Sequence, residues 1–274
     1  MPDIINSNIE KQVYAADKKG NLLQQVDKVF VVLSGNSMHV AGFSSSGEVL
    51  TIRCHPYDGR PDFLERNFTN EPLLTHTGKV SHIFVTAPKQ LLVPKAIYKE
   101  DTAAEWLNDL HFVGKDEAVH EYSLRDDKAQ YLFAFPLATR DLMIRYFPKA
   151  RIMPFAAHQF NKHYKTSQVL QCTFTEGEVY LTLYKDRKLQ WHQVANYNSV
   201  EDVAYQVKLL CQQQNLDEEH LAIIAAAETN ILTRRIHELF GYFPNLKIGT
   251  GKMDVQEGPW QAAVYLFQQL YSCV

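Results

Sequence analysis

The chain has 274 residues, of which 46% are hydrophobic, and a formal net charge of −3. This length and apolar content suffice for two compact cores of ordinary domain size. Because Lys and Arg are interspersed with Asp and Glu, the composition argues against a protein that neutralises a nucleic-acid backbone with a basic face.

The cysteines and the N-terminal residues bear on the cell compartment. Four cysteines without C-x-x-C spacing predict buried free thiols rather than a disulfide framework or a zinc site, at Cys54, Cys172, Cys211 and Cys273. Charged residues near the N-terminus fit no secretory signal, and no apolar run reaches membrane-spanning length. We therefore expect a cytoplasmic protein with no membrane span.

Three strands are predicted near the start of the chain, within residues 28–54, with turns at Gly35 and Gly47. An apolar strand is expected at Ser81–Pro88 and a corner at Leu91–Pro94. A helix is expected from Thr102, with a capping-box pattern. The segment 139–152 then predicts a helix that ends before Pro148 and leads into a strand. The basic cluster at 160–165 is expected to be a solvated helix end.

The second half repeats this pattern. Residues 168–194 predict three strands with turns at Gly177 and Asp186, and a helix is expected from Ser199, with Asp202 in its start signal. The apolar run 221–228 suits a strand buried on both faces by helices. Residues 233–248 echo 139–152 through a second Tyr-Phe-Pro, and an amphipathic helix at 259–274 is expected to close the core.

The repeat also indicates the domain organisation. The turn glycines Gly35 and Gly177 are 142 positions apart, whereas Tyr146 and Tyr242 are 96 apart, so the first half holds 46 extra residues. We predict a first domain at 1–166, carrying an inserted subdomain at about 72–127, and a second domain at 167–274.

Three antiparallel strands followed by alternating helices and strands, duplicated with an insertion in the first copy, resemble the actin-like ATPase superfamily. The hairpins at Gly35 and Gly177, the segment 84–98 and the two Tyr-Phe-Pro elements carry this resemblance over nearly the whole chain. More closely, the chain resembles an uncharacterised bacterial family, of Bacteroidetes type, with this fold and no assigned activity. The resemblance implies an α/β fold of two ribonuclease-H-like domains in an actin-like ATPase arrangement, with an inserted subdomain in the first.

In active members of the superfamily, ATP lies between the domains, and each first hairpin holds phosphates near an Asp two residues before the turn glycine. Those positions are Leu33 and Thr175 in this chain, although magnesium usually needs one or two protein carboxylates. The resemblance places the candidate cleft lining at two hairpins and one later loop. These residues are Ser34, Gly35, Asn36 and Ser37, then Thr175, Glu176, Gly177 and Glu178, and finally Ala226, Ala227 and Glu228.

The three segments differ in how well they suit a nucleotide. The first hairpin is small and polar enough to present backbone N–H groups to an anion. In the second, the charges of Glu176 and Glu178 oppose a phosphate. In the third, alanines stand where the superfamily has glycines, and each adds a β-carbon near the purine.

Other chemistries find little support in the residues. The sequence Gly249–Lys252 resembles part of a Walker motif, but Leu246 and Met253 occupy required positions, so we expect a loop. His158 and His163 are five residues apart, which does not suit paired metal ligands. No carboxylate lies on the first strand, as a two-metal nuclease would need. A Cys-His hydrolase stays open as an alternative, without a nucleophile-elbow pattern to support it.

The sequence favours a catalytically silent actin-like protein that acts as a protein-binding or assembly factor. We expect no catalytic residue, no metal and no cofactor, an unidentified protein partner and no nucleic acid, and a homodimer is left open. The alternative is a divergent ATP-binding protein or weak ATPase that uses Mg-ATP in the interdomain cleft. Both hypotheses rest in part on analogy of fold.

Overall fold

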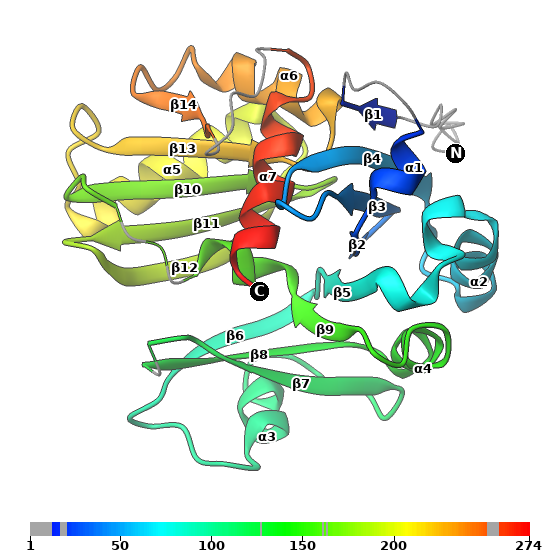
Figure 1. The fold of residues 1–274 in the computed structure, drawn as a ribbon. Coiled ribbons are helices and arrows are strands. Elements are labelled where there is room, and N and C mark those ends of the chain that lie inside the picture. The colour runs from blue at the N-terminus through cyan, green and yellow to red at the C-terminus, as the bar shows by residue number, and fades with distance from the viewer. Residues whose placement is uncertain (1–12, 17–20, 127, 161, 163, 251–257) are drawn as a thin grey trace, which may run out of the picture. The chain divides into compact units, whose positions relative to one another are not determined.

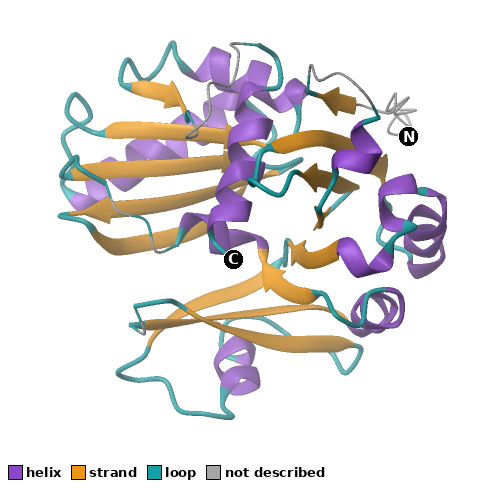
Figure 2. Ribbon diagram, in the orientation of Figure 1, coloured by secondary structure: helices purple, strands orange, loops and turns teal. Residues whose placement is uncertain are grey.

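The computed structural model describes residues 13–16, 21–126, 128–160, 162, 164–250 and 258–274. The chain forms two compact units, the first containing Met1–Val85 and Ala138–Ile152 and the second containing Thr86–Leu137 and Met153–Val274. Helices and strands follow one another in both units, as predicted for an α/β protein (Figure 2). The domain boundaries expected at 166 and around the insertion at 72–127 stay a prediction.

The first unit is built on a six-stranded sheet (Figure 1). β2 and β3 pair antiparallel, β3 and β4 also pair antiparallel, and β2 and β5 pair parallel. The three predicted strands with turns at Gly35 and Gly47 are confirmed. In sheet order β1-β4-β3-β2-β5-β9, the strands are β1 (Val13–Ala15), β4 (Val49–Pro56), β3 (Ser37–Phe43), β2 (Lys28–Ser34), β5 (Val80–Val85) and β9 (Arg151–Pro154).

Short helices complete the first unit. They are α1 (Leu22–Gln25), α2 (Pro61–Asn70), η1 (Pro72–Leu74), η2 (Thr77–Lys79) and α4 (Leu137–Tyr146). Proline suits the first turn of α2 because that position needs no backbone N–H. The ring of Phe68 in α2 packs 4.9 Å from that of Phe147, which follows α4. The predicted end of α4 before Pro148 is confirmed.

A five-stranded sheet forms the core of the second unit. Its order is β12-β11-β10-β13-β14, with β10 (Gln168–Phe174), β11 (Glu178–Lys185), β12 (Lys188–Asn196), β13 (Ala222–Ala227) and β14 (Leu246–Ile248). The helices α5 (Val200–Gln214) and α6 (Asn230–Leu239) share a core cluster with one face of the sheet. The helices α7 (Gln261–Ser272) and η3 (Phe155–Gln159) cover the other face (Figure 1). The buried strand predicted at 221–228 is confirmed as β13.

The two large sheets have the same strand order once β1 is set aside. In each, three antiparallel strands are followed by a parallel strand, β5 beside β2 and β13 beside β10. β5 therefore belongs to the six-stranded sheet, although the sequence placed it inside the insertion. Both sheets are continued by a last short strand after the helix that precedes each Tyr-Phe-Pro.

The second unit also contains a three-stranded sheet of order β6-β8-β7. Its strands are β6 (Lys89–Pro94), β7 (Glu117–Ser123) and β8 (Ala129–Pro136), and α3 (Ala103–Asn108) packs against one face. The corner expected at Leu91–Pro94 is wrong, because the apolar run before Pro94 is part of β6. Val93, Leu107 and Leu132 form the small core between the sheet and α3.

The predicted helix starts differ in their outcome. At α5, the backbone N–H of Asp202 donates to Ser199 Oγ at 3.3 Å, and the backbone N–H of Ser199 donates to Asp202 Oδ2 at 3.0 Å. This capping box is confirmed. At α3 the helix begins after Thr102 as expected, but the capping box is wrong: the Thr102 hydroxyl donates to the carbonyl of Lys99 at 2.6 Å instead.

The predicted buried free thiols are confirmed at all four cysteines. The solvated helix end expected at 160–165 is wrong, because η3 ends at Gln159 and Lys162 is packed against α7. Lys162 Nζ donates to Gln269 Oε1 at 2.6 Å, and burial lowers the pKa of its ammonium group to about 8. His163 and residues 251–257, with part of the Walker-like sequence, lie outside the described residues. No helix in the described ranges combines the length and apolar character needed to cross a membrane.

Candidate functional site

The first predicted hairpin lies in the first unit, between β2 and β3. Gly35 and Asn36 form an exposed turn, whereas Ser34 and Ser37 are buried. Ser34 Oγ lies 2.8 Å from Ser37 Oγ, which lies 2.8 Å from Nε2 of the buried His39. The serine hydroxyls are therefore engaged inside the sheet, and only the turn itself faces solvent.

The second predicted hairpin lies in the second unit, between β10 and β11. Gly177 has φ +85°, a backbone conformation that glycine adopts without a steric penalty. The backbone N–H and the hydroxyl of Thr175 both donate to the carbonyl of Glu178, at 2.9 and 3.0 Å. Glu176 is exposed on the turn. The Thr175 hydroxyl, which stands at the position of the superfamily's Asp, is thus used within the turn.

The third predicted segment meets the second hairpin at the same end of the sheet. Ala226 and Ala227 end β13, and Ala227 pairs with Phe174 of β10. The backbone N–H of Glu228 donates to the carbonyl of Phe174 at 3.1 Å. The structure therefore brings together the predicted residues of the second half, while the four predicted residues of the first half belong to the other unit.

Two acidic side chains share this end of the sheet. Glu228 is 1% exposed and Glu178 is partly buried. Burial raises the pKa of the Glu178 carboxyl, the charge of Glu228 raises it further, and a hydrogen bond from the Tyr180 hydroxyl opposes both effects. That hydroxyl lies 3.4 Å from Glu178 Oε2. This end of the sheet thus carries two acidic side chains that act on each other.

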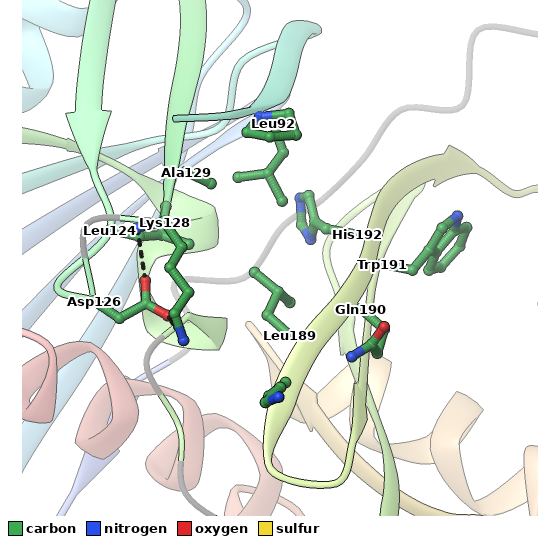
Figure 3. A pocket seen from close by; sticks show the side chains of 11 residues that line it. Leu92, Leu124, Asp126, Lys128, Ala129, Leu189, Gln190, Trp191 and His192 are labelled. Carbon is green, nitrogen blue, oxygen red and sulfur yellow. Dashed lines mark hydrogen bonds and ion pairs between the residues drawn. The ribbon is translucent and has the colours of Figure 1, made fainter. Parts of the chain in front are cut away.

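A groove that the sequence did not predict lies within the second unit, between β6 and β12. It consists of two pockets of about 440 and 330 Å³, and both are lined by Leu92 of β6 and His192 of β12. We call it the β6–β12 groove. Figure 3 shows Leu189 and His192 on the side of β12 that faces Leu92, while Trp191 points away.

The two ends of the β6–β12 groove differ in charge. The larger pocket is lined by Lys128 and Lys188, with Asp126 beside Lys128. The smaller pocket is lined by Glu178 and His111. The groove therefore connects a mainly basic end with the acidic end of the predicted site.

A chain of buried hydrogen bonds links η3 to the wall of this groove. Gln159 Nε2 lies 2.9 Å from Thr173 Oγ1 and 3.0 Å from the carbonyl oxygen of Tyr180. Gln159 Oε1 accepts from Thr182 Oγ1 at 2.6 Å, and Thr182 Oγ1 lies 2.8 Å from His192 Nδ1. Since a carbonyl can only accept, the Tyr180 contact fixes the orientation of the Gln159 amide.

This chain also fixes the tautomer of His192. The single hydroxyl proton of Thr182 is given to Gln159, so Thr182 Oγ1 must accept from the Nδ1–H of His192. The other ring nitrogen, Nε2, then carries a lone pair. Nε2 is buried and has no hydrogen-bond partner in the part of the chain that the structure describes. Burial lowers the pKa of His192 to about 3, so the ring stays neutral near pH 7.

No local sequence pattern marks the β6–β12 groove, because Leu92 and His192 are one hundred positions apart. The hydrophobic alternation of each strand indicates its two faces but not the strand that it approaches. Glu178 is the one candidate site residue of the sequence analysis that lines this groove.

Comparison with known proteins shows the family and the fold. The family model described as "Protein of unknown function (DUF3822)" matches residues 29–246. No match was found among the curated proteins. A protein with actin-like ATPase fold and unknown function from Bacteroides thetaiotaomicron is 12% identical, with 94% of this chain and 100% of that chain covered and a TM-score of 0.75.

Two further solved structures are similar over most of the chain. The PilM–PilN type IV pilus biogenesis complex is 11% identical, with 87% of this chain and 90% of that chain covered and a TM-score of 0.54. The cytoplasmic domain of EpsL, an inner membrane component of the type II secretion system of Vibrio cholerae, is 10% identical, with 90% and 95% coverage and a TM-score of 0.50. These likenesses confirm the predicted actin-like ATPase fold and the predicted kinship with an uncharacterised family.

Proposed function

This chain belongs to the DUF3822 family of proteins of unknown function, and we propose that it is a catalytically silent protein that binds a protein partner as an assembly factor. The observation that carries the proposal is the pair of acidic side chains, Glu178 and Glu228, at the second hairpin. Their charges occupy the end of the sheet where the superfamily holds phosphates.

The magnitudes support this interpretation. A carboxylate about 4 Å from a phosphate charge costs roughly 4 kcal/mol at an effective dielectric constant of 20. A hydrogen bond to a charged group contributes about 1.5 to 3 kcal/mol. One contact with Glu178 would therefore cancel the attraction of one backbone donor in the turn. Glu228 raises the pKa of Glu178, which indicates that this end of the sheet already disfavours negative charge.

The first hairpin offers no compensation. Leu33, at the position of the superfamily's Asp, is buried and apolar. The hydroxyls of Ser34 and Ser37 are bonded within the sheet rather than turned toward a ligand. Since magnesium usually binds through protein carboxylates together with phosphate oxygens, the residues of neither hairpin fit Mg-ATP.

The solved structures supply the analogy for a binding role. One is a complex formed for type IV pilus biogenesis, and another is a cytoplasmic domain of a secretion-system component. Both show that this fold occurs in assemblies, and the step from them to this chain rests on fold alone. We extend the proposal to a cytoplasmic location, where free thiols such as the four buried here persist, and to an origin of the two large sheets by internal duplication.

A turnover assay tests the catalytic part of the proposal. We expect phosphate release from Mg-ATP to match a control without protein. Magnesium-dependent release that Gly35→Trp abolishes would contradict the proposal. A β-carbon at Gly35 would meet no atom of the described residues within 4 Å, so the substitution begins in open space on an exposed turn. Gly78→Trp, at another open position of the same unit, is the matched control and should leave any such activity unchanged.

Isolation of the native complex tests the binding part. The tagged chain should return one stoichiometric partner after cross-linking in cells, and the cross-linked residues should identify the contacting surface. Sedimentation of the purified chain measures self-association independently. Recovery of the chain alone, as a monomer at every concentration, would count against an assembly role.

A further inference from the structure

β6 is an edge strand whose outer side is directed away from β8. The backbone N–H of Lys95 donates to the carbonyl of Lys128 at 2.8 Å, which sets the alternation of the β6–β8 ladder. In an antiparallel ladder, hydrogen-bonded residue pairs alternate with non-hydrogen-bonded pairs. Counting back from Lys95, Leu91 and Val93 therefore direct their backbone N–H and C=O groups to β8. Leu92 directs its own N–H and C=O to the outer side, where neither group has a hydrogen-bond partner in the described ranges.

Pockets lie along both faces of this edge. On the α3 face, a pocket of about 180 Å³ is lined by four successive residues of β6, Leu91 to Pro94, and by Trp106 and Leu110. On the opposite face lies the β6–β12 groove, lined by Leu92. Val93 and Leu91 pack with α3 in the small core, whereas Leu92 lines both pockets of the groove. Each face of the edge therefore has a pocket beside it, where alternate side chains of an added strand would lie.

We propose that an extended segment of a partner protein adds as a fourth strand to the outer edge of β6. Its backbone bonds to Leu92, and its side chains enter the α3-side pocket and the β6–β12 groove alternately. Strand addition gives affinity through main-chain hydrogen bonds and specificity through pockets for alternate side chains. This inference rests on the proposed protein-binding function and names the partner's chemistry.

The charges around the edge define the partner further. Near the C-terminal end of β6 the groove is lined by Lys188 and by the ion pair of Lys128 with Asp126, a net positive charge, and near the N-terminal end it is lined by Glu178. The segment therefore carries an acidic side chain beside the C-terminal end of β6, a basic side chain beside the N-terminal end, and apolar side chains between them. Pro94, which has no N–H, ends the edge and keeps the paired segment short.

The facing strand contributes acceptors and donors. The backbone N–H of Tyr197 donates to the carbonyl of Gly177, so by the same alternation His192 and Val194 direct their backbone groups away from β11. A segment held on β6 thus has polar groups of β12 beside it in the groove.

Two labelled peptides test the proposal on the full chain. The first is Lys-Ile-Thr-Val-Thr-Ile-Glu, and the second differs only by a terminal Lys in place of Glu. Fluorescence anisotropy should show tighter binding of the first peptide at low salt. Hydrogen exchange at Gln90 and Leu92 should slow when that peptide is bound, because strand addition protects outward amide groups.

The variant Leu92→Pro removes the outward N–H without removing a bond to β8, and proline is tolerated on a strand edge. It should lower the affinity for the first peptide about 5- to 10-fold, which is the loss expected for one hydrogen bond and an added steric conflict. If this variant fails to fold, Lys188→Glu still tests the charges. It should lower the affinity for the first peptide about 3- to 10-fold, and the second peptide should then bind more tightly than the first. Lys208→Glu, an exposed charge on α5 that lines none of the three pockets, is the matched control.

Several outcomes would overturn the proposal. They are no binding of either peptide at millimolar concentration, equal affinity for folded Leu92→Pro and wild type, and unchanged exchange in β6. A concentration-dependent dimer that Leu92→Pro abolishes would assign the edge to a second copy instead. Failure of the proposed function is distinguishable, because it would appear as Mg-ATP turnover or as the absence of any native partner. A native partner that binds Leu92→Pro normally would leave the function standing and remove only this inference.

Discussion

The hairpins at Gly35 and Gly177 join corresponding strands of two sheets with the same order, yet their polar groups are of different kinds. In the first, neutral hydroxyls bond to each other and to a buried histidine. In the second, two carboxyl groups lie at the end of the sheet, and the charge of one raises the pKa of the other. The same strand order is therefore compatible with either set of side chains, so the fold alone does not determine what the hairpins bind.

The largest expected contrast lies in the polar groups buried behind each hairpin. Thr182→Val should cost about 2 to 4 kcal/mol of unfolding free energy, because it leaves Gln159 Oε1 and His192 Nδ1 buried without their partner. Ser37→Ala should cost about 1 kcal/mol, since its two partners, Ser34 and His39, keep other interactions when the hydroxyl is removed.

Urea unfolding can measure the two variants separately. All three tryptophans, Trp106, Trp191 and Trp260, belong to the second unit. Their fluorescence follows that unit, whereas circular dichroism follows both. Equal costs for the two substitutions would show that the buried chain ending at His192 stabilises the protein no more than the serine pair does.

The turn glycines should differ by a smaller amount. Gly177→Ala forces a β-carbon into a backbone with φ +85° and should cost about 1 to 2 kcal/mol. Gly35 has no positive φ, and within the described ranges no atom lies within 4 Å of a β-carbon built there, so Gly35→Ala should change stability by less than about 0.5 kcal/mol. Thermal unfolding of both variants checks this, and a larger loss at Gly35 would refute the distinction between the turns.

The smallest expected effect concerns the acidic pair. The pKa of Glu178 is raised in the folded state, so this carboxyl binds a proton more readily in the folded chain than in the unfolded chain. Its contribution to the free energy of unfolding therefore falls as the pH rises through the folded-state pKa. At neutral pH, Glu178→Gln should therefore stabilise the second unit by on the order of 1 kcal/mol, and its advantage should shrink as the pH is lowered.

Glu176→Gln is the matched control, because Glu176 is exposed on the same turn. It should leave the pH dependence unchanged. Urea midpoints between pH 4 and pH 8 give both comparisons. If Glu178→Gln left the pH dependence of the urea midpoint unchanged, the proposed electrostatic effect of Glu228 on Glu178 would be contradicted.

The sequence predicted those features that depend on local patterns. Alternating strands, turn glycines and proline stops located both large sheets, and the pair Ser199 and Asp202 located a helix start that the structure confirms. The capping box expected at Thr102 was wrong, because a residue pattern does not reveal whether the hydroxyl bonds to the N–H groups of the following helix or to the preceding carbonyl of Lys99. The corner expected at Leu91–Pro94 was wrong for a related reason, since its partner strand β8 begins 35 positions after Pro94.

The candidate site was predicted only in part. Glu178 and Glu228 could be named from their places beside a turn and after an apolar strand, and the parallel pairing of β10 and β13 brings those segments together. The β6–β12 groove could not be predicted, because strands far apart in the chain form its walls. The solvated end expected at Lys162 was also wrong, because Gln269 and Ser272 that bind it come from the last helix.

Thermal unfolding with saturating Mg-ATP, compared with magnesium alone, shows whether the hairpins hold a nucleotide. Binding at one hundred times the dissociation constant would add about 2.7 kcal/mol, or roughly 5 to 10 °C for a chain of this size. We predict no shift in the wild type. A shift of that size, lost in Gly35→Trp and kept in Gly78→Trp, would contradict the account and identify the chain as a nucleotide-binding protein.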